Sequence, residues 1–319
     1  MNHAFLQVKF APRVQCGATL VELMIAVVLG LLVVLSMTNL LVTSMSVHSA
    51  QINATTMQDT ARNVFDNIAR SVRQAGYVDF NAQNAWFASS EDISPSIVGL
   101  DGSTLKATSY GIDSPTKSPD NASDVLAIRF FGSGESGDSN APLNCAGFGV
   151  GLSANSDATD EGRGWSIYYV AKDAYGETNL YCKYNAKNFT AQSIAEGVES
   201  FQVLYGIDTS DPANGIANQF VSASQINALD ANIPTSEYNK KTHWKKITAI
   251  KVALLIRGTE HANSNQPGTV YNLFGAGYDV PSDQGTKIID PGVAAPKSQS
   301  SPSTRKVFST TIQLKNVMN

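Results

Sequence analysis

The sequence has 319 residues, of which 23 are basic and 27 are acidic, so its formal net charge is −4 at pH 7. A mildly acidic chain argues against a general nucleic-acid-binding protein. The length allows one long helix followed by one large domain or two small ones. Abundant Gly, Ser, Asn and Asp favour a β-rich domain with long surface loops.

An apolar stretch close to the N-terminus is the first predicted element. Lys9 and Arg13 precede it, and no Asp, Glu, Lys or Arg occurs between Glu22 and Asp59. About twenty apolar residues at about 1.5 Å each span about 30 Å, the thickness of a bilayer core. The sequence therefore predicts a membrane-spanning helix at about residues 20–43. The basic leader predicts a cytoplasmic N-terminus and a chain that is otherwise periplasmic or outside.

The carboxylate of Glu22 lies where this apolar stretch begins. An ionised side chain in hydrocarbon costs roughly 2.5 to 3.5 kcal/mol on insertion scales, and less near the interface. The apolar core is too long for a secretory signal peptide, and no apolar segment precedes Cys16 as a lipoprotein signal requires. A plain signal anchor explains the hydropathy but not the acid, so we expect Glu22 to have a partner.

The basic leader, Gly17, Glu22 and the uninterrupted apolar helix together resemble the processing and assembly signature of type IV pilins and pseudopilins. The resemblance implies that a prepilin peptidase cleaves between Gly17 and Ala18 and that the new Ala18 amine is methylated. The family more often has Phe where this chain has Ala18. Residues 1–17 are then a leader peptide.

Cleavage would place an α-amino cation, with a normal pKa of about 7.7 to 8.0, at the end of a helix in the membrane. A neighbouring subunit's Glu22 neutralises this cation when two helices come into register. Because an unpaired charge is so costly in a low dielectric, the pair favours assembly. Glu22 is therefore interpreted as an assembly residue, with an intermolecular role only.

The helix is predicted to continue beyond the membrane as far as residue 76. Apolar residues recur at steps of three and four between Met57 and Ala75, and no proline occurs between residues 18 and 76. Gly76 is a typical stop signal. We expect one helix over residues 18–76, about 87 Å long, whose second half packs on a globular domain.

The remaining residues, 77–319, are predicted to form that domain. Alternating apolar runs predict strands, with a short further strand at 96–100; the main runs are residues 125–131, 165–171, 179–184, 198–207, 247–257 and 307–314. Residues 297–304 are predicted to be an exposed loop. Without a βαβ rhythm, the expected fold is α+β: a long helix on an antiparallel sheet.

Four segments, spread over the chain, are similar to the PilW minor pilins of type IV pili: residues 70–77, 198–208, 247–257 and 305–311. The resemblance implies a protein of the inner membrane and then of the pilus, which helps to initiate assembly and occupies the tip. Implied partners are other minor pilins, the major pilin, the prepilin peptidase and the inner-membrane assembly platform. It also implies that the protein supports twitching motility, adhesion or DNA uptake. It implies neither catalysis nor a cofactor.

Two cysteines, Cys145 and Cys182, remain once Cys16 leaves with the leader. In an oxidising periplasm they are predicted to form a disulfide. A closed loop of this length stabilises a fold by about 4 kcal/mol on the chain-entropy model. A redox-active or metal-binding pair is the alternative, but the Cys-x-x-Cys spacing is missing.

Other candidate sites have a simple structural interpretation beside the functional one. Asp208, Asp211 and Asn214 suggest either Ca²⁺ binding or an Asx turn, and the turn is favoured because the EF-hand spacing is missing. Residues 157–161 contain an acidic cluster, Asp157, Asp160 and Glu161, in a predicted loop. The basic segment, residues 240–246, is either an acidic-partner or nucleic-acid surface or, more simply, a solvated strand entry; its members are Lys240, Lys241, His243, Trp244, Lys245 and Lys246.

Outside the expected leader, the histidines are His48, His243 and His261. They show no arrangement with Ser or carboxylate that indicates catalysis, so no enzyme and no metal site are predicted. Three functions remain. A structural minor pilin is favoured, and a type II secretion minor pseudopilin of the GspJ kind is the second. A membrane-anchored adhesin or binding protein is the third.

Overall fold

The computed structural model of this chain describes residues 17, 19–79, 91–134, 141–152, 162–261, 268–289 and 303–315. The side chains of residues 259–261 and 303 are outside this description. Most of the expected leader, residues 1–16, and the acidic cluster at residues 157–161 also lie outside it. The chain divides into two units, residues 1–51 and residues 52–319.

Helix α1 (Leu20–Gln74) begins in the first unit. Its large apolar side chains from Leu20 to Val47 are 54–75% exposed, on all faces. Helix α1 is long and apolar enough to cross a membrane, by length and composition. A helix that is apolar on every face is stable only in apolar surroundings. Within the first unit, no other described residues cover the apolar side chains of this part of α1.

The second part of α1, residues 52–74, belongs to the globular unit and has one buried face. The residues of that face recur at the predicted spacing and are at most 3% exposed: Met57, Ala61, Val64, Ile68 and Val72. The helix ends as predicted, because Gly76 adopts a left-handed φ of 66°. The amide of Gly76 donates to the Arg129 carbonyl at 3.1 Å, which attaches this end to strand β4.

Two antiparallel sheets, rather than the single sheet that was predicted, form the globular unit. The five-stranded sheet contains, in spatial order, β1 (Ile97–Leu100), β4 (Val125–Phe130), β5 (Gly164–Lys172), β6 (Thr178–Asn185) and β7 (Phe189–Glu196). The four-stranded sheet contains β13 (Ser303–Gln313), β10 (Ile247–His261), β8 (Val198–Ile207) and β9 (Gln219–Val221).

Smaller elements complete the unit. Two short strand pairs are β2 (Ser103–Thr104) with β3 (Thr116–Lys117), and β11 (Val270–Asn272) with β12 (Lys287–Ile289). The short helices are α3 (Ala223–Leu229), η2 (Thr235–Glu237), α4 (Tyr238–Lys241) and η3 (His243–Lys246). The α+β class is therefore confirmed.

Besides the smaller elements, which were not predicted, three details differ from the sequence prediction. Strand β7 was missed, because its segment has few β-branched residues and mostly half-exposed or exposed side chains, as an edge strand can have. Strand β13 begins at Ser303, so the end of the predicted loop at 297–304 is strand, and residues 297–302 lie outside the description. The basic segment, predicted as a strand entry, forms the short helices α4 and η3 directly before β10.

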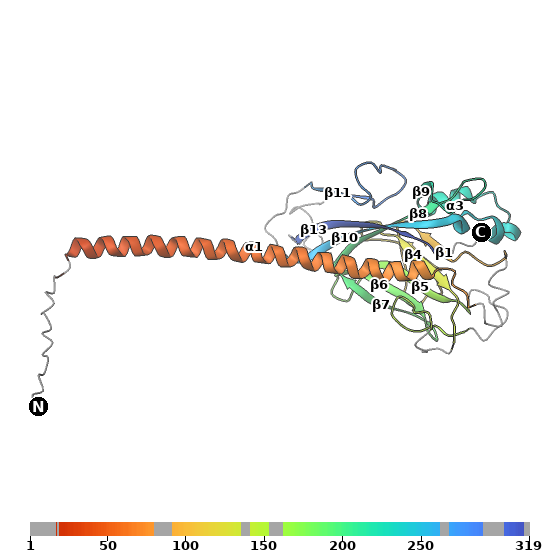
Figure 1. The fold of residues 1–319 in the computed structure, drawn as a ribbon, viewed down its shortest axis with the longest axis horizontal. Helices are drawn as coiled ribbons and strands as arrows, with labels where there is room; N and C mark the ends of the chain where they lie inside the picture. The colour runs from red at the N-terminus through yellow and green to blue at the C-terminus, as the bar shows by residue number, and fades with distance from the viewer. Residues whose placement is uncertain are drawn as a thin grey trace, which may run out of the picture. The chain divides into compact units, whose positions relative to one another are not determined.

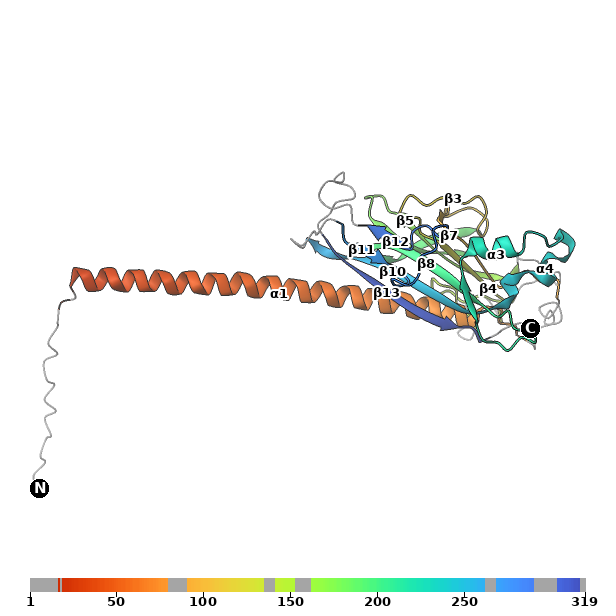
Figure 2. The same cartoon turned by 90° about the horizontal axis from the view of Figure 1, so that it is seen from above.

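The core lies between α1 and both sheets. Inward side chains from β4, β5 and β6 and from β8 and β10 pack with the buried face of α1 in one cluster. Figures 1 and 2 show this second part of α1 running beside strands of both sheets. Because this face of α1 packs against both sheets, it covers the inner face of each of them.

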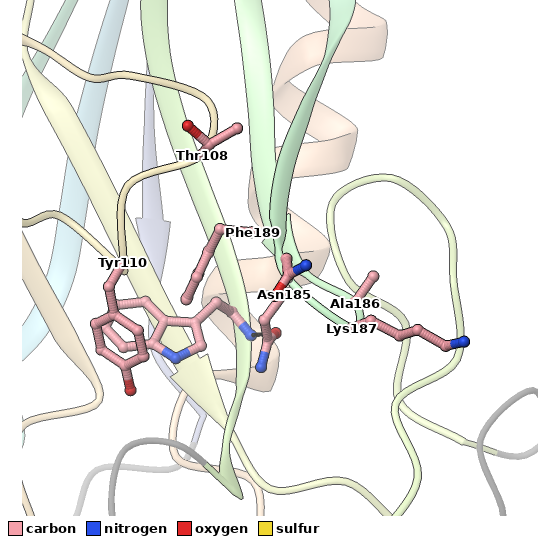
Figure 3. Close-up of a pocket in the computed structure, with 8 residues that line it drawn as sticks. Thr108, Tyr110, Asn185, Ala186, Lys187 and Phe189 are labelled. Atoms are coloured by element: carbon pink, nitrogen blue, oxygen red, sulfur yellow. Dashed lines mark hydrogen bonds between the residues drawn. The ribbon is translucent and has the colours of Figure 1, made fainter.

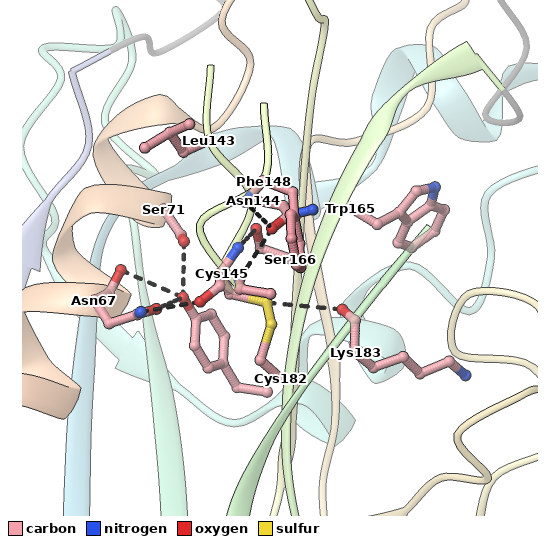
Figure 4. Close-up of a disulfide and its surroundings, with 12 residues drawn as sticks. Asn67, Ser71, Leu143, Asn144, Cys145, Phe148, Trp165, Ser166, Cys182 and Lys183 are labelled. Carbon is pink, nitrogen blue, oxygen red and sulfur yellow. Dashed lines mark hydrogen bonds between the residues drawn. A yellow bond between two sulfur atoms is a disulfide. The ribbon is translucent and has the colours of Figure 1, made fainter. Parts of the chain in front are cut away.

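A buried hydrogen-bond relay joins α1 to the five-stranded sheet (Figure 4). Ser71 Oγ and the Tyr168 hydroxyl are 2.7 Å apart, and the Tyr168 hydroxyl donates to Asn67 Oδ1 at 2.6 Å. Asn67 Nδ2 donates in turn to the Cys145 carbonyl at 3.0 Å. Burial raises the pKa of Tyr168 above its usual value, so this hydroxyl stays protonated and remains a donor.

The predicted disulfide is present beside the relay. Cys145 and Cys182 are bonded, with their Cα atoms 5.8 Å apart, inside the usual range for a disulfide. Cys182 lies in β6 and is the register partner of Tyr168 in β5. The disulfide therefore fastens the loop that contains Cys145 to the same part of the sheet that holds α1.

Replacing both cysteines, as Cys145→Ser with Cys182→Ser, is expected to lower the free energy of unfolding by about 3 to 4 kcal/mol, because the sequence separation of 37 residues is no longer closed. Denaturant unfolding of the micelle-embedded chain, followed by tryptophan fluorescence, measures the loss. Reduction of the unmodified protein is the control and should give a similar loss. A double variant as stable as the oxidised protein would contradict this prediction.

The Tyr168→Phe variant should lose about 1 to 2 kcal/mol of unfolding free energy, since Ser71 and Asn67 then lose a buried partner. The matched control is Tyr169→Phe, the next residue in β5, for which no hydrogen bond of the hydroxyl to the described part of the chain is found. The same unfolding measurement is used for both. Equal stabilities of the two variants would show that the relay contributes little.

Candidate functional site

The N-terminal end of α1 is capped by Thr19. Its hydroxyl Oγ1 accepts from the backbone amide of Glu22 at 3.3 Å, and its carbonyl accepts from the amide of Leu23 at 3.1 Å. Thr19 is thus the N-cap residue and Glu22 is the third residue of the helix, the spacing of a capping box. Thr-x-x-Glu is visible in the sequence, but the sequence interpretation gave Glu22 an intermolecular role only.

This position corrects that interpretation. A carboxylate in the first turn is stabilised by the helix dipole by typically 0.3 to 1 kcal/mol, so Glu22 has a role within its own helix as well. The hydrogen bond to Thr19 uses the backbone of Glu22 and not its carboxylate. Glu22 is exposed and has no ion pair with any residue that the structure describes, so its carboxylate is available to another molecule.

Gly17 is exposed, and the position that a Cβ would take there has no atom within 4 Å. Ala18, the expected methylation site, lies outside the described residues. The expected cleavage and methylation positions therefore stay predictions.

The Asp208 loop matches the Asx-turn interpretation rather than the calcium alternative. The Asp208 carboxylate accepts from the amides of Ser210, Asn214 and Gly215 at 2.9, 2.7 and 2.6 Å. These bonds, with that from the Ser210 amide first, lower the pKa of Asp208. The side-chain oxygen of Asn214 accepts from the amide two residues on. Both oxygens of Asp208 are thus already used to shape the loop that contains Asp211.

Two of the four lysines of the basic segment form ion pairs within the chain, and a third donates to a backbone carbonyl. Lys240 forms an ion pair with Asp92 at 3.4 Å, Lys241 pairs with Glu237, and Lys245 donates to the Glu91 carbonyl at 2.6 Å. Trp244 is buried and stacks edge-to-face on Tyr205, with ring centroids 5.0 Å apart. The segment is therefore a packed entry to β10, which does not favour a surface for nucleic acid.

His243 has a structural partner. Its Nδ1 lies 2.6 Å from Oδ1 of Asp230, and its amide donates to the same oxygen at 3.0 Å. The Thr242 hydroxyl donates to the other carboxylate oxygen, so Asp230 joins the end of α3 to the start of η3. Thr242 and His243 both bond to the Asp230 carboxylate, and His243 is therefore not placed to activate the Thr242 hydroxyl as a nucleophile. His48 lies in α1, and the side chain of His261 is not described.

No group of three or more His, Cys, Asp or Glu side chains suited to a metal occurs in the part of the chain that the structure describes. The surface of the globular unit does have a hollow lined by aromatic rings near the turn between β6 and β7 (Figure 3). Sequence reasoning missed it because its lining residues come from separate parts of the chain.

Two family models match the sequence. The model of the prokaryotic N-terminal methylation motif matches residues 12–38, and the model described as type IV pilus-assembly protein W, PilW, matches residues 167–316. No functionally curated protein matches. Among solved structures, the chain is similar to a type IV-like pilin, TTHA1219, from Thermus thermophilus, at 12% identity, covering 82% of this chain and 98% of that one with a TM-score of 0.36.

The two matched regions correspond to the two parts of the molecule described above. The methylation motif covers the end of the expected leader, the capped start of α1 and its exposed apolar stretch. The PilW match runs from β5 through β13, across both sheets. The apolar helix and the motif indicate anchoring in a membrane, and the family acts structurally, together with other pilus components, rather than as enzymes. The chain belongs to the PilW family and is a minor pilin of type IV pilus assembly.

Proposed function

We propose that this minor pilin helps to initiate pilus assembly and occupies the pilus tip, after cleavage between Gly17 and Ala18 and methylation of the Ala18 amine. The observation that carries the proposal is the exposed carboxylate of Glu22, in the first turn of a helix whose next charged residue is Asp59. A helix with one charge at its end and apolar side chains on every face associates with similar helices once that charge is paired.

The proposed pairing is between Glu22 of one subunit and the Ala18 amine of the next. The structure supports it because the N-cap bond occupies the backbone amide of Glu22 and leaves the carboxylate without an ion pair among the described residues. Pairing therefore does not require the helix to lose its cap. The same arrangement explains why an acid is tolerated at the entrance of a membrane helix before assembly, since the helix dipole and the interface both lower its cost.

The proposed topology has a cytoplasmic N-terminus, a span at about residues 20–43 and a periplasmic globular unit, because Lys9 and Arg13 lie before the apolar stretch. The proposed specific partners are other minor pilins, the major pilin, the prepilin peptidase and the inner-membrane assembly platform. The PilW match favours the pilus over a type II secretion system.

A deletion strain should therefore lose twitching motility and piliation while it keeps exoprotein secretion; the opposite phenotype would identify a pseudopilin.

Processing gives the first prediction of this proposal. Protein isolated from membranes should begin at Ala18 and carry one methyl group on its amine, because the peptidase is expected to recognise Gly17 and the apolar helix after it. Intact-mass analysis detects both changes. A strain without the prepilin peptidase is the control and should retain residues 1–17. A mature chain that still contains Lys9 and Arg13 in peptidase-positive cells would contradict processing.

The second prediction concerns the charge of Glu22. Glu22→Ala should insert and fold, but association should fall by about two to three powers of ten, since an unpaired member of a desolvated pair costs about 3 to 5 kcal/mol. Cells should then carry fewer pili with normal amounts of this protein in the membrane, measured by electron microscopy and immunoblotting.

Two variants separate charge from helix capping. Glu22→Gln keeps the length and the capping-box residue type but removes the charge, so it should fail like Glu22→Ala. Thr19→Ala removes the cap and keeps the charge, so it should leave piliation nearly normal at a cost of about 1 kcal/mol in helix stability. Normal piliation with Glu22→Gln would show that the charge is not what assembly requires.

A further inference from the structure

The hollow beside the β6–β7 turn has features of a ligand site that the pilin function does not use. Its volume is about 500 Å³, within the range of small-molecule pockets. Three aromatic rings, Tyr110, Trp165 and Phe189, line it together with polar residues from the turn and from the segment between β2 and β3. We name it the aromatic hollow.

The aromatic rings stand edge-to-face. The centroids of Tyr110 and Phe189 are 5.1 Å apart at an interplanar angle of 73°, and those of Trp165 and Phe189 are 5.8 Å apart at 77°. Trp165 and Phe189 are nearly buried, whereas Tyr110 is 43% exposed. Figure 3 shows Tyr110 and Phe189 bordering the same space. Tyr110 therefore presents ring surface to a ligand while the other two rings hold it in place.

The segment that contains Tyr110 is held in place by the protein itself, without a ligand. The ammonium group of Lys183, in β6, donates to the Lys106 carbonyl at 3.0 Å and to Ser109 Oγ at 2.9 Å, which holds the segment before Tyr110 against the sheet. Gly111 has a φ of 46°, and a Cβ there would lie 3.1 Å from the Trp165 ring. A preformed site loses less conformational entropy when it binds a ligand.

The rim supplies polar groups that no described part of the chain uses. The side chains of Thr108, Lys187 and Asn188 are exposed and make no hydrogen bond or ion pair with a described residue. Asn185, in contrast, is committed to the fold: it accepts from the Trp165 amide at 3.0 Å and donates to the Arg163 carbonyl at 2.8 Å. A ligand can therefore find one hydroxyl, one amide and one ammonium group around the exposed ring of Tyr110.

This combination selects a class of ligand. An acyl chain would form no hydrogen bonds with the rim groups. A nucleic-acid strand needs several cations for its phosphates, whereas Lys187 is the one charged residue among those that line the hollow. A pyranose has an apolar face of C–H groups, which stacks on an aromatic ring, and hydroxyl groups around its edge. Its shape and chemistry match the Tyr110 ring and the polar rim together.

The position of the aromatic hollow is suited to recognition. Trp165 is the register partner of Arg129, whose carbonyl accepts from Gly76 just after α1 ends. Gly258, by contrast, lies near Asn53, close to where the chain enters the globular unit at residue 52. The hollow is therefore at the end of the globular unit where α1 terminates, away from the point at which the chain enters.

We propose that the aromatic hollow binds a pyranose unit of a glycan, with the sugar's C–H face on Tyr110 and its hydroxyl groups bound by Thr108 and Asn188. This site is additional to pilus assembly and does not depend on where in the pilus the subunit lies. It would give this minor pilin a direct contact with a saccharide surface.

The test uses the full chain in micelles of lauryl dimethylamine oxide, a detergent without a sugar group, and saturation-transfer NMR. The probes are methyl β-glucopyranoside, methyl β-galactopyranoside, N-acetylglucosamine and glucuronic acid, with empty micelles as the blank. At least one probe should bind in the millimolar range with saturation greatest on one ring face. Tyr110→Ala should weaken that binding at least tenfold, and Asn188→Ala about threefold, because each removes one of the proposed contacts.

Two variants serve as matched controls. Tyr175→Ala removes a tyrosine that is 92% exposed and lies outside the hollow, so binding should be unchanged. Tyr110→Phe keeps the ring and should keep most of the affinity, which would show that binding requires the ring and not the hydroxyl group. Absence of saturation transfer to all four probes would overturn the proposal, as would equal binding by Tyr110→Ala and Tyr175→Ala. Tyr110-dependent binding of a ten-residue oligothymidylate without any pyranose binding would identify a nucleic-acid site instead.

Discussion

The packing of one helix face against two sheets is the constraint on which the globular unit depends. Each fully buried aliphatic side chain of that face, such as Val64 or Ile68, contributes about 1.5 to 3 kcal/mol relative to exposure. Apolar burial has no direction, however, and leaves the helix free to slide. The relay from Ser71 through Tyr168 to Asn67 fixes its position, because a shift would leave buried polar groups without partners.

The same helix meets different surroundings in its two parts. Residues 52–74 are amphipathic and are satisfied within the globular unit, whereas residues 20–51 expose apolar side chains on all faces. The first part is therefore stable only in lipid or among other apolar helices. Glu22 is the one acid in that part, and its place in the first turn makes it both a favourable helix residue and a charge that a neighbouring subunit can neutralise.

The outer faces of the two sheets are covered by segments with little regular structure. Residues 101–117 cover the five-stranded sheet with a small cluster around Trp165, and the segment between β11 and β12 covers the four-stranded sheet through Leu273 and Phe274. Such coverings can vary without disturbing the core that α1 makes. The aromatic hollow lies where the first covering meets the β6–β7 turn, so a binding site can exist there without affecting assembly.

The sequence alone determined the features that depend on local pattern: the helix and its end at Gly76, the apolar stretch, the cleavage motif, most strands and the α+β class. Two remaining cysteines left one possible pair. Tertiary structure decided the division into two sheets and the edge strand β7. It also decided the hydrogen bonds of Asp208 and the ion pairs of the basic segment. It also brought together Tyr110, Trp165 and Phe189, which have no common local pattern. Strand pairing and side-chain contacts join residues distant in the chain, and periodicity within one segment carries no information about them.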